Sequence, residues 1–333
     1  MNELSKRLAH LSPKQRELLL KKLQQANREP ASEFKIQPRK NPSNYPLSFA
    51  QERLWFLQQL APESPFYNMP MALLIRGKLN QSSLKQAIAY LLDRHEILRS
   101  FYITGKDGNP SQKIAKLREV PFQCSEKFLD LETIDQLIKD EVSQPFDLTK
   151  APLIFFKLFK INENESILLI NLHHIIADGW SVNVMIDELL RLYRQIQSGK
   201  KPLLPEPKIQ YADFAEWHNQ FIFSPRVTQQ LKFWEDYLQG MPQVLEFVTD
   251  YPRPAVQNHE GKQLIKKVDS ILYQNLLNLA KSLQITPYSL FLAITQLFLL
   301  KITGQPDFGV GVPLANRHRK AFEKLVGFFV NTG

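Results

Sequence analysis

The sequence predicts an α+β protein built from two lobes. Its strand-like segments cluster in hairpins and do not follow a strict strand–helix–strand alternation, which favours α+β. Its 333 residues exceed the roughly 100–200 residues of one usual domain. A stretch with three prolines at 199–207 interrupts the chain and marks the lobe boundary. With 44% hydrophobic and 23% charged residues, the composition is that of a globular protein.

Residues 1–44 are expected to precede the compact part as a helix and a linker. The helix covers Pro13–Gln25, where a serine cap and a proline stand at its start. Glu29–Pro46 contains three internal prolines and no apolar periodicity, which is typical of a linker. Residues 1–40 hold ten Lys/Arg and four Asp/Glu, so they carry most of the net charge of +9. No aromatic residues are interleaved as in nucleic-acid-binding segments, so we expect a solvated basic helix.

Residues 45–207 are predicted to form the first lobe. A strand at Met71–Leu79 precedes a helix that Ser82 or Ser83 caps. Two hairpins are predicted because polar turn residues separate paired apolar runs. Their strands are Phe101–Ile103 with Gln112–Ile114, and Leu153–Ile161 with Ser166–His173; a helix then covers Trp180–Gln197.

Residues 208–333 are predicted to form the second lobe. Its expected helices are Tyr211–Phe223, Thr228–Gln239, Ser270–Leu283 and Pro287–Ile302, and its expected strands are Gln263–Val268 and Phe308–Val312. The most apolar stretch, Leu290–Leu300, is about half the roughly 20 residues of a membrane span. A single cysteine, Cys124, excludes a disulfide framework and a cysteine-built zinc site. We expect a cytoplasmic protein that binds neither membranes nor nucleic acids.

The residues that could carry chemistry gather at 171–180. His173 and His174 follow an apolar strand, and adjacent strand residues point to opposite faces, so we expect one to face a cavity and the other to be buried. A metal site made of both is therefore disfavoured, and no further ligand follows at metal-binding spacing. Two interpretations stay open. The histidines are core residues followed by a turn, or one of them transfers protons at an exposed strand end.

Other catalytic signatures are absent from the sequence. No Gly-x-Ser-x-Gly elbow and no glycine-rich phosphate loop occur, and Cys124 stands in no recognisable nucleophile setting. The chemistry therefore needs a base or a polarising group, without a covalent enzyme intermediate or a nucleotide.

The segment His173–Ser181 resembles the HHxxxDG motif of condensation domains in nonribosomal peptide synthetases. Four other segments resemble further motifs of this family, in the order expected: Ser48–Trp55, Arg94–Phe101, Tyr211–Trp217 and Val326–Thr332. The forms AQERLW and DGWS resemble the subtype that joins an L-configured donor to an L-configured acceptor. Heterocyclising relatives carry an aspartate-based motif in place of the histidine pair, and this chain lacks it.

The resemblance implies a chloramphenicol-acetyltransferase-like fold of two lobes with a tunnel between them. The α-amino group of an acceptor would attack a donor thioester and form a peptide bond. Both substrates would arrive on phosphopantetheine arms of carrier domains, upstream for the donor and downstream for the acceptor, beside an adenylation domain. The domain itself would bind no cofactor and no metal. Because the chain stops inside the fifth motif, we expect an incomplete second lobe. A noncatalytic carrier-docking fragment and a free-standing acyltransferase using acyl-CoA remain as alternatives.

The resemblance also assigns the site residues. His174 is expected at the reaction centre as a base or an orienting group, with His173, Asp178 and Gly179 completing the motif. Asp178 is expected to be structural and paired with an arginine. The supporting residues are expected to be Arg94 as its partner, Arg99 as the second choice, Trp217 through packing, and Asn331. Gly179 would keep the tunnel open and free its N–H, or simply form a turn.

Overall fold

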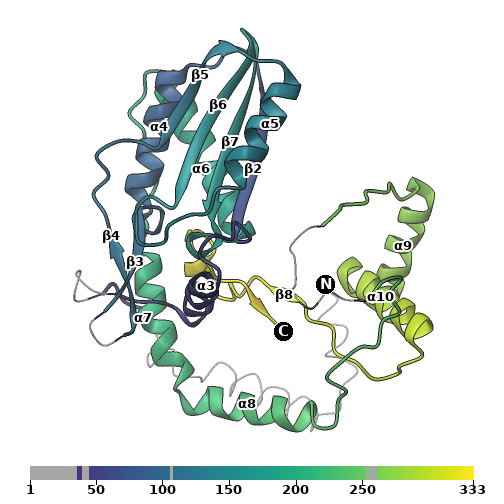
Figure 1. Ribbon diagram of the computed structural model, residues 1–333. Helices are drawn as coiled ribbons and strands as arrows, with labels where there is room; N and C mark the ends of the chain where they lie inside the picture. The colour runs from purple at the N-terminus through teal and green to yellow at the C-terminus, as the bar shows by residue number, and fades with distance from the viewer. Residues whose placement is uncertain (1–35, 40–44, 106–107, 253–254, 256–260) are drawn as a thin grey trace, which may run out of the picture. The chain divides into compact units, whose positions relative to one another are not determined.

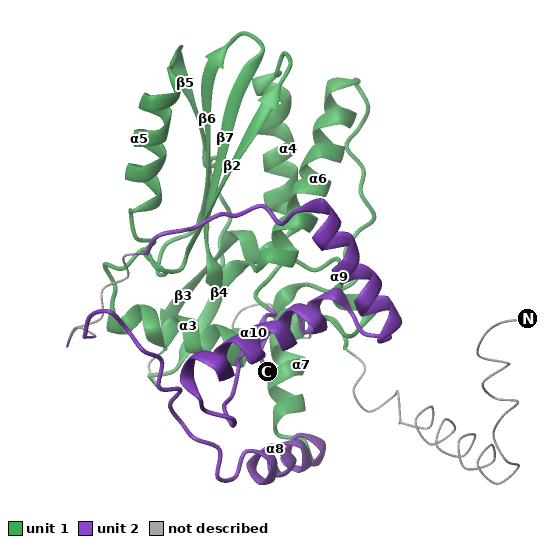
Figure 2. Ribbon diagram, turned by 90° about the vertical axis from the view of Figure 1, so that its right-hand side faces the viewer, with its two compact units in different colours: residues 1–224, 317–328 green, residues 225–316, 329–333 purple. Residues whose placement is uncertain are grey.

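The computed structural model describes residues 36–39, 45–105, 108–252, 255 and 261–333. The helix predicted at Pro13–Gln25 lies outside the described residues. The chain divides into two compact units, which Figure 2 distinguishes by colour. Unit 1 comprises the residues up to Ser224 together with Arg317–Phe328, and unit 2 comprises Pro225–Asn316 with Phe329–Gly333.

A four-stranded sheet forms the centre of unit 1 (Figure 1). Its strand order is β2-β7-β6-β5, with bounds Asn68–Arg76 for β2, Glu165–His173 for β7, Ile154–Asn162 for β6 and Phe122–Phe128 for β5. The central strands β6 and β7 pair antiparallel around a polar turn, which confirms the second predicted hairpin. β2 is antiparallel to β7, whereas β5 is parallel to β6.

Helices cover both faces of this sheet (Figure 1). α4 (Gln81–Arg94) and α6 (Gly179–Gln197) lie on one face, and α5 (Leu131–Val142) lies on the other. Alternation along β7 explains the arrangement, because Leu169 packs with Ile134 of α5 while its neighbours point to α4 and α6. The cap of α4 is Asn80, which accepts the Ser83 N–H at 2.9 Å. The predicted start at Ser82 or Ser83 is therefore wrong, because the asparagine side chain satisfies the first free amide.

A smaller sheet and two helices complete unit 1. Its strand order is β1-β4-β3, with bounds Tyr45–Pro46 for β1, Pro110–Ile114 for β4 and Ser100–Thr104 for β3. β3 and β4 form the first predicted hairpin. α3 (Phe49–Leu60) begins with a capping box in which Ser48 and Gln51 satisfy each other's backbone amides. α7 (Tyr211–Ile222) contacts β1 and α3, and three single turns of 3-10 helix lie at Glu96–Arg99, His174–Ile176 and Lys320–Phe322.

The division into units differs from the predicted lobe boundary at residue 207. α7 lies beyond that boundary, yet Asn219 Nδ2 donates to the Leu47 carbonyl at 2.8 Å and ties the helix to unit 1. Arg317–Phe328 returns to unit 1 because Arg317 is buried there beside Asp178. Both contacts join residues more than 100 positions apart, so no linker composition could have shown them.

Unit 2 is mainly helical. Its elements are α8 (Pro225–Tyr237), α9 (Ser270–Ser282), α10 (Pro287–Thr303), β8 (Pro313–Leu314) and β9 (Asn331–Thr332). The strands predicted at 263–268 and 308–312 are wrong, because neither range forms a strand in the described part. The short strand β8 begins directly after the second range, and Val312 exchanges backbone hydrogen bonds with Gly333. Across the described residues, no single helix is long and apolar enough to cross a membrane. α9 and α10 reach that length and hydropathy only when taken together, and the chain bends by 104° between them.

Candidate active site at the end of strand β7

The strand β7 ends between the two histidines. His173 is its last residue, and His174 begins the 3-10 turn that follows. The backbone amide of His173 donates to Leu153 O at 3.0 Å, and that of His174 donates to Tyr67 O at 2.8 Å. The change of backbone conformation, and not strand alternation alone, therefore separates the two side chains.

His173 is the buried member of the pair, with 1% of its surface exposed. Its Nδ1 accepts the Ile175 N–H at 3.1 Å, so its proton resides on Nε2, which lies 3.4 Å from Gln58 Oε1. Burial lowers the pKa of His173 to about 3, with a smaller contribution from the neighbouring His174. The ring is neutral at physiological pH and has both nitrogens occupied, which is the geometry of a structural residue.

His174 is half-buried and is positioned by two contacts within unit 1. Its Nδ1 lies 2.7 Å from Ala177 O, and a carbonyl can only accept, so Nδ1 carries the proton. In the neutral ring, Nε2 then holds a free lone pair. The edge of the Phe328 ring packs against the imidazole at a centroid distance of 4.8 Å. This geometry can accept a proton from a substrate, or orient a substrate N–H, at Nε2.

Asp178 pairs with Arg317, which corrects the expected pairing with Arg94 or Arg99. Arg317 Nη2 lies 3.0 Å from Asp178 Oδ1, and the two side chains are 1% and 4% exposed. The same carboxylate oxygen caps α6 by accepting the Ser181 N–H at 2.8 Å. Burial lowers the pKa of Arg317, and the adjacent carboxylate offsets part of this shift. Asp178 thus caps α6 and pairs with an arginine 139 residues away.

Ser181 and Tyr211 attach the segment after Arg317 beside the histidines. Ser181 Oγ lies 3.0 Å from Gly327 N and 2.6 Å from Arg317 Nη2. The Tyr211 hydroxyl donates to Phe328 O. A Cβ on Gly327 would lie 1.8 Å from the Tyr211 ring, so only glycine permits this close approach. The Phe328 that contacts His174 is therefore fixed from both sides.

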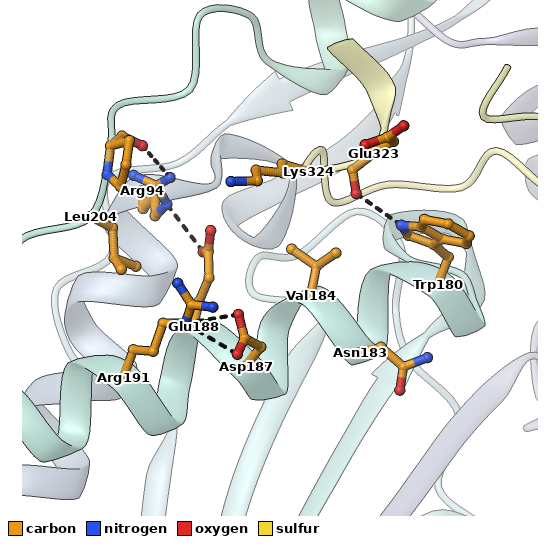
Figure 3. A pocket seen from close by; sticks show the side chains of 11 residues that line it. Arg94, Trp180, Asn183, Val184, Asp187, Glu188, Arg191, Leu204, Glu323 and Lys324 are labelled. Carbon is orange, nitrogen blue, oxygen red and sulfur yellow. Dashed lines mark hydrogen bonds and ion pairs between the residues drawn. The ribbon is translucent and has the colours of Figure 1, made fainter. Parts of the chain in front are cut away.

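Arg94 and Arg99 perform other structural tasks. Arg94 Nε reaches from α4 to Glu188 on α6 at 3.0 Å (Figure 3). His95 Nε2 also lies 2.6 Å from Glu188. Burial raises the pKa of Glu188, but the hydrogen bonds and charges of His95 and Arg94 outweigh it, so the pKa stays below its ordinary value. Arg99 donates to the backbone carbonyls of Leu92, Ala115 and Asp93. Arg94 also donates to the Pro205 carbonyl, so Glu188 and four backbone carbonyls satisfy the two arginines expected at Asp178.

The remaining predicted residues have different surroundings. Gly179 is exposed, and a Cβ built on it meets no described atom within 4 Å, so sterics do not require glycine there. Trp217 is buried and stacks on Phe221 at 5.3 Å, in the packing role expected. Asn331 lies in β9 of unit 2 and is exposed. Within the described ranges, no three His, Cys, Asp or Glu side chains lie close enough to hold a metal ion.

Sequence reasoning missed Arg317 and Gln58. A buried carboxylate needs a cation, but the chain has 42 Lys and Arg residues and nothing local selects one of them. Gln58 stands one helical turn beyond the end of the first motif segment, where its 4% exposure could not be foreseen.

Comparisons with known proteins identify the family. A model of the condensation domain matches residues 41–332. The chain is 39% identical over 298 residues to gramicidin S synthase 2 of Aneurinibacillus migulanus, covering 89% of this chain and 6% of that protein. The X-domain from teicoplanin biosynthesis matches with a TM-score of 0.80 at 24% identity, covering 90% of this chain and 66% of that one. A four-domain nonribosomal peptide synthetase bound to AMP and glycine matches with a TM-score of 0.76 at 25% identity, covering 91% and 23%.

These matches confirm the fold class inferred from the motifs. The structural neighbours include condensation domains, which have the chloramphenicol-acetyltransferase-like fold. The family model spans all five motif segments, from Ser48–Trp55 to Val326–Thr332. The chain belongs to the condensation-domain family of nonribosomal peptide synthetases.

Proposed function

We propose that this chain catalyses peptide-bond formation between a carrier-bound donor thioester and the α-amino group of a carrier-bound acceptor. Family membership supports the reaction class. The observation that carries the site assignment is the fixed orientation of His174, whose Nδ1–H is held by Ala177 O, so that Nε2 of the neutral ring is the nitrogen left for the substrate.

The proposed step has a defined proton requirement. A free α-amine has a pKa near 7.7–8.0, so much of it is protonated at pH 7, and only the neutral amine attacks. Attack on the thioester carbonyl forms the C–N bond, the C–S bond breaks, and the carrier thiolate leaves. The amine nitrogen sheds one proton, which Nε2 of His174 accepts and the thiolate finally receives. Positioned proton transfer contributes about 10²–10⁴-fold, and holding two tethered substrates together contributes further.

The substrates and partners follow from the same proposal. The matched relative is a synthase of which this chain spans 6%, so we propose carrier domains and an adenylation domain as its partners. The donor and acceptor would be delivered on phosphopantetheine arms in the cytoplasm. The AQERLW and DGWS forms support an L-configured donor and acceptor, and loading the donor carrier with D- or L-aminoacyl groups tests this.

The deciding experiment is single-turnover condensation with two preloaded carrier proteins. His174→Ala should remove most amide formation while the melting temperature stays near that of the unchanged protein. His173→Ala should act mainly through stability, because it leaves Gln58 and the Ile175 amide without their buried partner, at a cost of about 1–3 kcal/mol.

The outcomes separate the competing assignments. Full activity in His174→Ala would show that orientation of the tethered substrates alone carries the reaction. Loss of activity in His173→Ala at unchanged stability would exchange the two roles. Condensation with acyl-CoA at a rate equal to that with a loaded carrier would favour a free-standing acyltransferase.

A further inference from the structure

Arg39, one of the described residues 36–39 that precede β1, is bound to unit 1 by several contacts. Its Nη2 lies 2.8 Å from Glu96 Oε1 and 2.6 Å from Glu96 Oε2. Its backbone N–H donates to Asp213 Oδ1 at 3.0 Å, and its guanidinium stacks on the Tyr45 ring at 4.4 Å. The side chain is only 14% exposed. An arginine in a region with linker composition thus makes the contacts of a core residue.

The Asp213 carboxylate, which accepts the Arg39 N–H, also caps the start of α7. Asp213 Oδ2 accepts the Gln210 N–H at 2.7 Å and forms the capping box of that helix. Gln210 in turn donates from Nε2 to Arg94 O at 3.0 Å, and its Oε1 accepts the Glu96 N–H. The Arg39 guanidinium also approaches this carboxylate, with Nη1 3.6 Å from Asp213 Oδ1, so it neutralises both Glu96 and Asp213 beside the N-terminus of α7.

The first residue of α7 reaches the reaction centre. The Tyr211 hydroxyl lies 2.8 Å from Ser48 Oγ and donates to Phe328 O. The Phe328 ring packs against His174 at 4.8 Å. The connection runs from Arg39 to Asp213, along the first turn of α7 to Tyr211, and from its hydroxyl to the backbone of Phe328, whose ring borders the imidazole; all of these residues belong to unit 1.

We propose that Arg39 is a positioning residue for the condensation site, acting through α7 and Phe328 on the orientation of His174. This inference rests on the proposed role of His174. Removing the guanidinium takes the same cation from Asp213 and from Glu96, so the start of α7 and the Tyr211 hydroxyl shift. Displacements of about 1 Å at a reacting group cost up to 10²-fold in rate.

The test compares Arg39→Met, which removes the charge, with Arg39→Lys, which keeps the charge but loses the planar fork. Arg76→Met is the matched control, because Arg76 is 78% exposed and pairs only loosely with Glu165 at 3.8 Å. Saturating single-turnover rates, carrier KM and melting curves are measured on the protein containing this sequence. We expect Arg39→Met to lower the saturating rate about 10-fold or more with carrier KM within two-fold, and Arg39→Lys to be intermediate.

A second readout does not depend on activity. The ring current of Phe328 shifts the NMR resonances of the His174 ring protons, so Arg39→Met should move them and Arg76→Met should not. If the unchanged protein forms no amide, the proposed function fails, and this NMR comparison still decides the positioning role. Unmoved His174 resonances in Arg39→Met, or a rate equal to that of Arg76→Met, would overturn the inference. A change in carrier KM alone would also overturn it.

Discussion

Replacing Asp178 by Asn should destabilise unit 1 by several kcal/mol without removing the helix cap. The pair with Arg317 is almost fully buried, with an N–O distance of 3.0 Å and side-chain exposures of 1% and 4%, so solvent screens it little. Removing one partner of such a pair costs about 3–5 kcal/mol, because the other charge stays buried without its counterion. An asparagine still accepts the Ser181 N–H that begins α6.

Two further variants separate the contributions. Asp178→Ala also removes the cap and should cost about 1 kcal/mol more than Asp178→Asn. Asp187→Asn is the matched control on the same helix. Asp187 pairs with Arg191 at 3.0 Å, but both side chains are about 60% exposed. An exposed pair of this kind contributes less than about 1 kcal/mol.

The assay is urea unfolding at pH 7, read as midpoint and slope for each variant. A thermal scan should agree, with about 2–4 °C lost per kcal/mol for a unit of this size. A double-mutant cycle with Arg317→Met should give a coupling energy of the two sites above about 1 kcal/mol. The reasoning is refuted if Asp178→Asn costs no more than Asp187→Asn, or if the two buried substitutions are additive.

Two other predictions concern the same region. Gly327→Ala should lower the free energy of urea unfolding by about 1–3 kcal/mol or more, because the added Cβ would overlap the Tyr211 ring. Gly179→Ala should change this free energy little, because a Cβ there meets no described atom within 4 Å. Equal effects of the two substitutions would contradict the close approach of Gly327 to Tyr211. The buried His173, with its pKa lowered to about 3 against about 6.5 when unfolded, is neutral in both states above pH 6.5, so stability is lost as pH falls below that value. Protonation of His173 in the unfolded state should lower the free energy of unfolding by about 2 kcal/mol between pH 7 and pH 5. In His173→Gln, the free energy of unfolding should fall correspondingly less over this pH range.

Local signals in the sequence predicted the elements that carry the histidines. The polar turn at 162–165 marks the β6–β7 hairpin, because its asparagines and glutamates separate the apolar runs of the two strands. The helix predicted to begin at Trp180 is α6, which begins one residue earlier in the structure, at Gly179, because Asp178 caps it. Such features are encoded within a few residues, because a turn or a cap is satisfied by its own neighbours.

The features that sequence reasoning missed depend on distant partners. Neither the parallel pairing of β5 with β6 nor the packing of α5 on the sheet can be predicted without the tertiary arrangement. α5 did carry a usable signal, since Asp130 caps it and accepts the Thr133 N–H at 2.8 Å. Arg317 had no such signal. Burial, and not spacing, decides which arginine compensates Asp178.

The hydrogen-bond partner of His174 Nδ1 distinguishes this site from a catalytic triad. In catalytic triads, a carboxylate on Nδ1 orients the imidazole and stabilises its charged form. Here the acceptor on Nδ1 is the neutral carbonyl of Ala177, and the nearby carboxylate of Asp178 is bound to Arg317. The arrangement therefore gives His174 a fixed direction and tautomer through a neutral acceptor. Because an amine nucleophile is already partly neutral at pH 7, we expect holding the two tethered substrates together to supply the larger part of the rate.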